Sequence, residues 1–251
     1  MADRTFAIGD LHGELDQLFA LLSTFPALDE RDTLVFLGDY LDRGSRSKDL
    51  VDYVRSTLPR QTPAKVVALR GNHEDAWLRV IDHGWPGFVV PPGNGCFETF
   101  RSFAGGAMPA EGETPTAAEA EQMLKGSFFP DDVVDWMRRL PFFYEDDHAI
   151  YVHAGLPKND DGSWPHPSDI EDKTPILWLR TEDFFLNYRG KTVVVGHTVT
   201  EYLPQEYSSY TPDDPSDLWA GKNVIAIDTG CGAGGFLTSI ELPLGNVYES
   251  R

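Results

Sequence analysis

Three short apolar runs in the first part of the chain each lead directly into a Gly-Asp or Gly-Asn pair, and further polar side chains follow at once. The segments are GDLHG at 9–13, GDYLDRG at 38–44 and GNHE at 71–74. Glycine before the polar residue permits a tight turn out of a strand. Because the carboxyl ends of neighbouring parallel strands face the same edge of a sheet, we expect the three loops to converge.

Strand-like and helical patterns alternate around these segments. Residues 5–8, 33–37 and 65–69 are typical of strands, and apolar residues at helical spacing follow each of them. This alternation predicts an α/β fold with functional loops at the strand ends. Further strands are expected at 149–152, 192–195, 224–227 and 236–242, and helices at 15–22, at 48–58, from about Glu74, at 116–124 and at 131–140.

We expect a single domain over residues 1–251, because no repeat, low-complexity tract or linker interrupts the chain. Glycine and proline are frequent in 84–112, and 202–217 is rich in loop-forming residues. Both segments are therefore expected to be surface insertions or flaps. They are also the segments in which we expect substrate specificity to reside.

Charge limits the classes of partner. The formal net charge of −19 argues against a nucleic-acid or anionic-membrane binder, because both surfaces would repel the protein. The sequence contains no apolar run of about eighteen residues, the length of a membrane span, and its first residues lack the pattern of a signal peptide. With Cys96 and Cys231 as the two cysteines, we expect a reduced, cytoplasmic chain.

Two later strands end in a similar way, the first in His153 (HAG) and the second in His197 (GHT). Five strand ends thus present Asp, His or Asn. A single Gly-Asp is commonly a simple turn, and a single buried histidine is more often a core residue than a ligand. Five such strand ends in one chain favour a metal centre. Their mixture of carboxylate, imidazole and amide groups suits manganese, iron or zinc.

The three GD and GN blocks resemble the signature of the calcineurin-like metallophosphoesterases. They resemble most the phosphoprotein phosphatase branch, which includes bacterial and phage serine/threonine phosphatases. The resemblance runs from Ile8 to about Thr238, with HAG and GHT in the expected order. It implies a four-layer α/β/β/α sandwich with two central mixed sheets.

The resemblance also implies a pair of divalent metal ions, with manganese expected and iron or zinc as alternatives. Asp39 resembles the carboxylate that bridges both ions. Asp10 and His12 resemble ligands of the first ion. The implied ligands of the second ion are Asn72, His153 and His197.

The expected reaction is in-line attack on phosphorus by a hydroxide held between the two metals. In the family pattern His73 resembles the catalytic acid, oriented by Asp42, and Arg43 and Asn72 contact the phosphate. Arg180 lies in a Leu-Trp-x-Arg stretch that resembles the second phosphate-binding arginine of bacterial relatives. The alternative for Arg180 is a charge on a helix surface.

The leading interpretation is a serine/threonine protein phosphatase that acts on a phosphorylated protein or a small phosphoester, without nucleic-acid or membrane partners. Val199 stands where many metallophosphoesterases have a histidine, which favours the phosphatase branch. A symmetrical diadenosine tetraphosphatase is the nearest alternative. The Asp42-Arg43 pair and Glu74 favour the phosphatase, because tetraphosphatases often lack the pair and have GNHD. An inactive binding module on the same fold ranks lower, and the role of Cys231 stays open.

Overall fold

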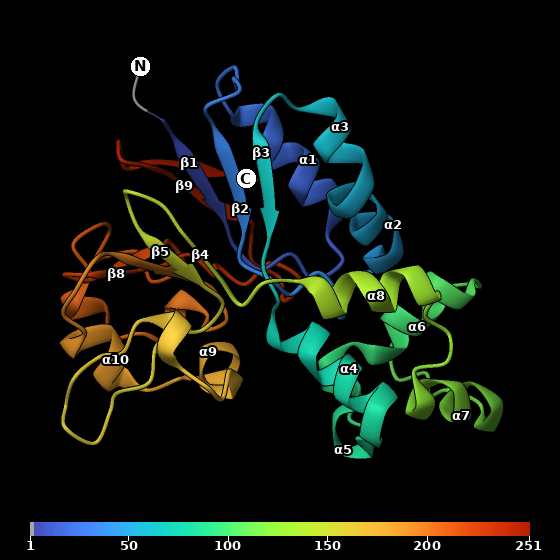
Figure 1. Cartoon of the computed structure of the whole chain (residues 1–251). Coiled ribbons are helices and arrows are strands. Elements are labelled where there is room, and N and C mark those ends of the chain that lie inside the picture. Colours follow the sequence, from blue (N-terminus) through green and yellow to red (C-terminus); the bar gives the residue numbers. More distant parts are fainter. Residues whose placement is uncertain (1–2) are drawn as a thin grey trace.

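A computed structural model gives the fold of residues 3–251, so the first two residues of the expected domain lie outside the described part. Two five-stranded sheets form its centre (Figure 1). The first has the order β10-β9-β1-β2-β3, with β1 Thr5–Ile8, β2 Thr33–Phe36, β3 Lys65–Ala68, β9 Thr238–Leu242 and β10 Asn246–Glu249. The second has the order β4-β5-β6-β8-β7, with β4 Phe143–Glu145, β5 Ile150–Val152, β6 Val193–Val195, β7 Trp219–Ala220 and β8 Val224–Ala226.

Both sheets are mixed. In the first sheet β1, β2 and β3 are parallel, and β9 and β10 add an antiparallel edge. In the second sheet β5, β6 and β8 are parallel, and β4 and β7 close the two edges in antiparallel fashion. The parallel strands of each sheet direct their carboxyl ends to one edge, which is where the ligand-type residues follow in the sequence.

Helices cover the outer face of each sheet. The helices that follow β1 and β2 are α1 (Leu15–Thr24), α2 (Ser47–Asp52) and α3 (Leu58–Gln61), with a π-helical turn at Tyr53–Thr57 between the last two. Five more lie together beyond the end of β3: α4 (Asn72–His83), α5 (Pro86–Val89), α6 (Cys96–Ala104), α7 (Ala117–Lys125) and α8 (Asp131–Arg139). The second sheet is accompanied by α9 (Thr174–Trp178) and α10 (Glu182–Asn187).

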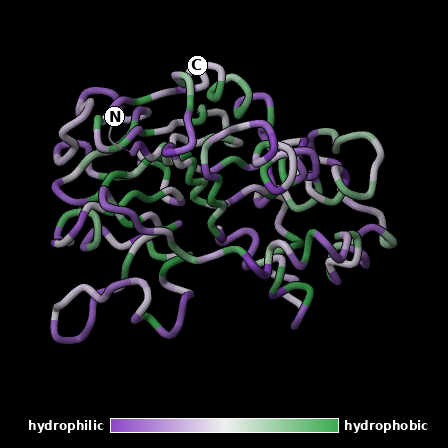
Figure 2. The backbone as a smooth tube through the Cα atoms, turned by 45° about the horizontal axis from the view of Figure 1, so that its top comes forward, coloured by the Kyte–Doolittle hydropathy of each residue, from purple (hydrophilic) through white to green (hydrophobic). Residues whose placement is uncertain are grey.

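Alternation of side chains along the strands explains the layers. Phe6 and Ile8 of β1 face the helices, whereas Ala7 packs in a separate cluster between the two sheets. On the second sheet, Tyr151 of β5 and Val194 of β6 meet Ala7 in that same inner cluster. Figure 2 shows the apolar segments gathered towards the middle of the molecule and the hydrophilic segments in peripheral loops. The expected four-layer sandwich with two mixed sheets is confirmed.

The structure differs from the sequence prediction in the 84–112 segment. This segment contains α5 and α6, and Cys96, Phe97 and Phe100 of α6 are buried in the main core. Glycine and proline at 91–95 suggest a loop, but the following nine residues carry apolar side chains at helical spacing. The 202–217 segment is irregular, with only a short 3₁₀ turn at Gln205–Tyr207 and the end of another at Thr200–Tyr202. None of the helices in residues 3–251 has the length and apolarity that crossing a membrane requires.

Candidate metal centre

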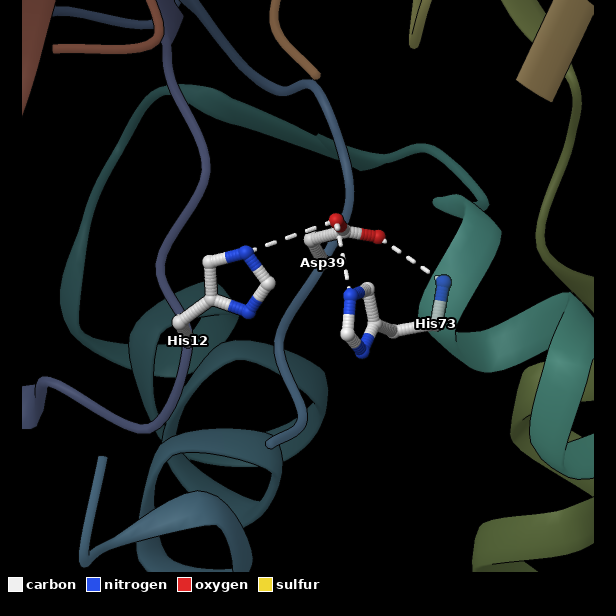
Figure 3. A group of neighbouring side chains, drawn as sticks. All are labelled: His12, Asp39 and His73. Atoms are coloured by element: carbon white, nitrogen blue, oxygen red, sulfur yellow. Dashed lines mark hydrogen bonds and ion pairs between the residues drawn. The ribbon is translucent and has the colours of Figure 1, made fainter. Parts of the chain in front are cut away.

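The strand ends converge on one buried cluster. Asp10 and His12 follow β1, Asp39 follows β2, and His153 and His197 follow β5 and β6 of the other sheet. Asn72 and His73 come from the first turn of α4, directly after β3. All of these side chains are buried. Figure 3 shows the Asp39 carboxylate between the rings of His12 and His73.

Asp39 is the common member of two groups of side chains that could each hold a cation. The first group is His12, Asp39 and His73, and the second is Asp39, His153 and His197. The Nε2 atoms of His12 and His153 each lie 3.5 Å from an Asp39 carboxylate oxygen. The structure thus brings the predicted ligands together around the carboxylate that the sequence analysis expects to bridge two ions.

The tautomers of His12 and His153 are determined by the backbone. Each ring donates its Nδ1–H to a main-chain carbonyl, to Leu41 at 2.9 Å and to Leu37 at 2.9 Å respectively. A carbonyl can only accept, so each neutral ring turns a bare Nε2 lone pair towards the Asp39 carboxylate. Facing lone pairs repel unless a cation lies between them, so this arrangement fits a bound metal ion.

Asn72 adds a further ligand-type atom to the second group, Asp39, His153 and His197. Its Oδ1 atom lies 2.8 Å from His153 Nε2 and 2.8 Å from His197 Nδ1. The remaining ring nitrogen of His197, Nε2, is buried and has no hydrogen-bond partner among residues 3–251. One amide oxygen and two imidazole nitrogens therefore meet at one point, a set of ligands that suits a borderline divalent ion.

Backbone strain is concentrated in the cluster. Within residues 3–251, five non-glycine residues have positive φ, and all five are predicted site residues: His12 (42°), Asp39 (54°), Asp42 (71°), Arg43 (67°) and His197 (64°). Such conformations cost about 1–3 kcal/mol each and persist where surrounding contacts impose them. One such contact is the close approach of Gly71, where an added Cβ would lie 2.1 Å from Asp39 Oδ1.

Electrostatics also favour a cation. Burial, with the charges of Asp228 and Asp39, raises the pKa of Asp10 well above its ordinary range. Burial likewise lowers the pKa of His12 well below its ordinary value, and lowers that of His197 to about 2. The neutral imidazoles are in the protonation state that a metal ion needs, and a bound cation would offset the crowding of negative charge that raises the pKa of Asp10.

A histidine–carboxylate pair lies beside the cluster. His73 Nδ1 is 2.7 Å from Asp42 Oδ2, and the Trp77 indole N–H donates to both Asp42 oxygens, at 2.9 and 3.1 Å. Burial by itself would lower the pKa of His73, but Asp39 and Asp42 together raise it. The Asp42 backbone N–H is bonded to the Thr99 hydroxyl at 2.7 Å. These contacts fix the ring of His73 and favour its charged form.

Two arginines line a pocket of about 580 Å³ next to His197. The guanidinium of Arg43 has no hydrogen bond or ion pair in the part of the chain that the structure describes, and Arg180 makes one long contact, 3.4 Å to His197 Nδ1. Segment 84–112 reaches this pocket through Gly95 and Glu98, and segment 202–217 through Tyr202. Guanidinium groups without carboxylate partners suit phosphate oxygens.

Sequence reasoning missed the structural role of several residues that support the site. Glu74 accepts backbone N–H groups from Gly71, Asp39 and Tyr40, at 2.9–3.0 Å, and so joins the second block to the third. Its place three residues after Gly71, the N-cap of α4, is a capping signal that could have revealed this. Asp228 follows β8 as the other ligand-type residues follow their strands, and its carboxylate interacts with that of Asp10.

Trp77 and Thr99, which both bond to Asp42, lie outside the sequence motifs, so nothing in the sequence indicated their roles. Cys231 is buried, and burial raises the pKa of its thiol far above the ordinary value, so it is not poised as a nucleophile.

The chain thus has an α/β fold, a buried cluster that could hold metal ions and an adjacent pocket that suits phosphate. A family model described as "Calcineurin-like phosphoesterase" matches residues 4–219. The chain therefore belongs to the calcineurin-like phosphoesterase family.

Curated relatives carry a narrower name. The chain is 30% identical over 155 residues to a symmetrical bis(5'-nucleosyl)-tetraphosphatase of Marinomonas sp. (strain MWYL1), and 31% identical over 156 residues to one of Yersinia pestis (strain Pestoides F). These matches cover 61% of this chain but only 44% and 42% of the two relatives. The matched region thus spans less than half the length of the curated relatives.

Solved structures show the same fold at low identity. A cold-active protein-tyrosine phosphatase of a Shewanella species aligns over 100% of this chain and 81% of its own, with TM-score 0.55 and 16% identity. A metallophosphoesterase from Sphaerobacter thermophilus aligns over 99% of this chain and 87% of its own, with TM-score 0.52 and 16% identity.

Proposed function

We propose that the chain is a phosphomonoesterase of the serine/threonine protein phosphatase type that works with two divalent metal ions. The observation that carries this proposal is the buried His73–Asp42 pair, 2.7 Å apart, beside the Asp39 cluster. The substrate would be a phosphorylated protein or a small phosphoester. Because both cysteines are free and buried, we also propose a cytoplasmic location.

The cluster supplies two sets of ligands. Asp10, His12 and Asp39 would hold the first ion, and Asp39, Asn72, His153 and His197 would hold the second. Manganese is our preferred metal, and iron or zinc suit the same ligands. When bound, two such ions clamp a phosphate and lower the pKa of a water molecule, so that hydroxide is available near neutral pH.

His73 supports the choice of a phosphate monoester of an alcohol. Its Nδ1 is occupied by Asp42, so a proton on Nε2 is free for transfer to the departing oxygen. A serine or threonine alkoxide is a poor leaving group and needs that proton. A nucleoside diphosphate leaves as a stable anion and needs it far less. Arg43 and Arg180 line the adjoining pocket, and together with Asn72 of the cluster they would orient the phosphate oxygens.

Symmetrical hydrolysis of diadenosine tetraphosphate is the second candidate. Similarity to the Marinomonas and Yersinia tetraphosphatases favours it. Tyr202, with 77% of its surface exposed, lines the same pocket as Arg43 and Arg180 and offers a ring on which a purine could stack.

Turnover measurements separate these functions. The manganese-loaded protein is assayed with a phosphoserine peptide, p-nitrophenyl phosphate and diadenosine tetraphosphate, and kcat/KM is compared. We expect the two monoesters to be hydrolysed and the peptide to be preferred over the dinucleotide. Preference for diadenosine tetraphosphate would select the second candidate. No turnover of any of the three, with metal demonstrably bound, would contradict an enzymatic function.

The His73→Asn variant tests the proposed acid. We expect it to keep its metal and to lose turnover most strongly with alkyl phosphates, by roughly 10²–10⁴-fold, because these leaving groups depend on proton transfer. Metal content by mass spectrometry and kcat for alkyl and p-nitrophenyl esters are the readouts. An equal loss for both kinds of ester would refute the acid role.

A further inference from the structure

A second pocket lies next to the phosphate pocket and has a different chemistry. Its volume is about 540 Å³, and most of its lining is apolar, including Val89, Val90, Phe97, Met123 and Leu124. The start of α6 takes part in both pockets, because Glu98 lines each of them. The two pockets therefore adjoin at Glu98.

The pocket is framed by a loop held in place by one arginine. Residues 109–115 form one side, and Arg101 of α6 pairs with Glu113 at 3.1 Å and with Glu119 of α7 at 2.9 Å. The Ala110 N–H also donates to Glu113, at 2.9 Å. Contacts of this kind tie the loop to the two helices, so the space is part of the folded architecture.

The rim combines apolar and acidic character. Val90 is 66% exposed although it lines the pocket. Glu98 and Glu111 line it too, and neither carboxylate has a hydrogen bond or an ion pair with any residue in 3–251. An exposed apolar side chain at a concave site, flanked by unpaired carboxylates, suits a ligand that carries an apolar group next to a cation.

We propose that this pocket receives a large apolar side chain of a phosphorylated polypeptide, from a residue close to the phosphorylated one. Glu98 and Glu111 then favour a Lys or Arg beside that apolar residue. The inference rests on the proposed phosphatase function and adds a sequence preference to it. A small phosphoester such as p-nitrophenyl phosphate occupies only the phosphate pocket and is insensitive to the second one.

The preference is measured with phosphoserine peptides in which each of three positions on either side of the phosphoserine is changed from Gly to Leu. For the manganese-loaded full chain, we expect Leu at one position to raise kcat/KM by roughly tenfold or more, from burial of its side chain. A neighbouring Arg should raise it further, and a neighbouring Glu should lower it.

A variant that fills the pocket tests whether the Leu side chain binds there. Ala120→Phe places a ring in the pocket from α7, and we expect it to abolish the preference for Leu while p-nitrophenyl phosphate turnover stays unchanged. Ala117→Phe, an equal change at an exposed position of the same helix, is the matched control and should keep the preference. If thermal denaturation shows that Ala120→Phe is unfolded, Val90→Asp at the rim replaces it with the same expectation.

Two results would overturn the inference while leaving the phosphatase function intact. One is turnover of all peptides with no preference at any position. The other is a Leu preference that survives in both pocket variants. Absence of turnover with every phosphate ester, p-nitrophenyl phosphate included, would instead overturn the proposed function, and this inference with it.

Discussion

Asp42 shows how much of the site is built by residues outside the set of proposed metal ligands. Its carboxylate is bonded to His73 and Trp77, its N–H is bonded to Thr99, and its backbone has a left-handed φ of 71°. The sequence predicted the pairing of Asp42 with His73 from the family pattern. It could not predict Thr99, because that contact joins residues 57 positions apart and depends on how α6 packs.

Replacing Thr99 by Val removes the partner of the Asp42 N–H and leaves that donor buried. We expect a loss of about 1–3 kcal/mol in the free energy of unfolding, because an unsatisfied buried donor bears the full desolvation cost. Urea denaturation measures the loss. Turnover of alkyl phosphates should fall more than that of p-nitrophenyl phosphate, through displacement of Asp42. Thr99→Ser keeps the hydroxyl and should restore both properties. If Ser and Val behave alike, the hydroxyl does not position Asp42.

At the scale of elements, the strand–loop–helix units were the predictable part. Each parallel strand of the first sheet was expected within a residue of its observed bounds, because apolar runs ending in Gly-Asp or Gly-Asn carry a strong local signal. The sequence analysis did not predict helix α6, because the glycines and prolines before it are typical of a loop. It nevertheless positions Asp42 through Thr99 and contributes Glu98 to both pockets.

A substitution of Gly95, at the start of α6, tests the contact between this helix and the GDYLDRG segment at 38–44. Its φ is +77°, and an added Cβ would lie 2.0 Å from the Arg43 N atom. We expect Gly95→Ala to destabilise the protein by about 1–3 kcal/mol and to raise KM for phosphate monoesters, because Arg43 must move. Gly105→Ala, at the other end of α6, where φ is also positive (+85°) and a Cβ meets nothing within 4 Å, is the control for both measurements. Equal effects of the two substitutions would contradict this role of Gly95.

For the whole molecule, the decisive feature is that the ligand-type residues of two sheets meet at one site, although the parallel strands that carry them lie in different halves of the chain. Asp10, His12 and Asp39 come from one sheet, and His153 and His197 come from the other. Sequence patterns predicted which residues take part but not their spacing, which depends on the packing of Ala7, Tyr151 and Val194 between the sheets. Because residues of both sheets pack together in this inner cluster, we propose that the chain forms one domain.

Metal removal should therefore weaken the whole fold. Without a cation, the carboxylates of Asp10, Asp39 and Asp228 lie close together in a buried space. We expect dialysis against a chelator to lower the melting temperature by about 5 °C or more, and excess manganese to restore it, because a ligand that binds the native state stabilises it. Differential scanning calorimetry provides the values. A melting temperature that does not respond to chelator or manganese would argue against a structural link between the ions and the fold.

The account depends most on Asp39 as the residue shared by two metal sites, and metal content measures this directly. Mass spectrometry of the manganese-loaded protein should give about two ions per chain. Asp39→Asn, neutral and of equal size, should lower both occupancies together, to well below one ion per chain. Asp213→Asn, at an exposed position, should leave the content unchanged. A wild-type chain that binds no manganese, or an Asp39→Asn variant with undiminished occupancy, would contradict the account.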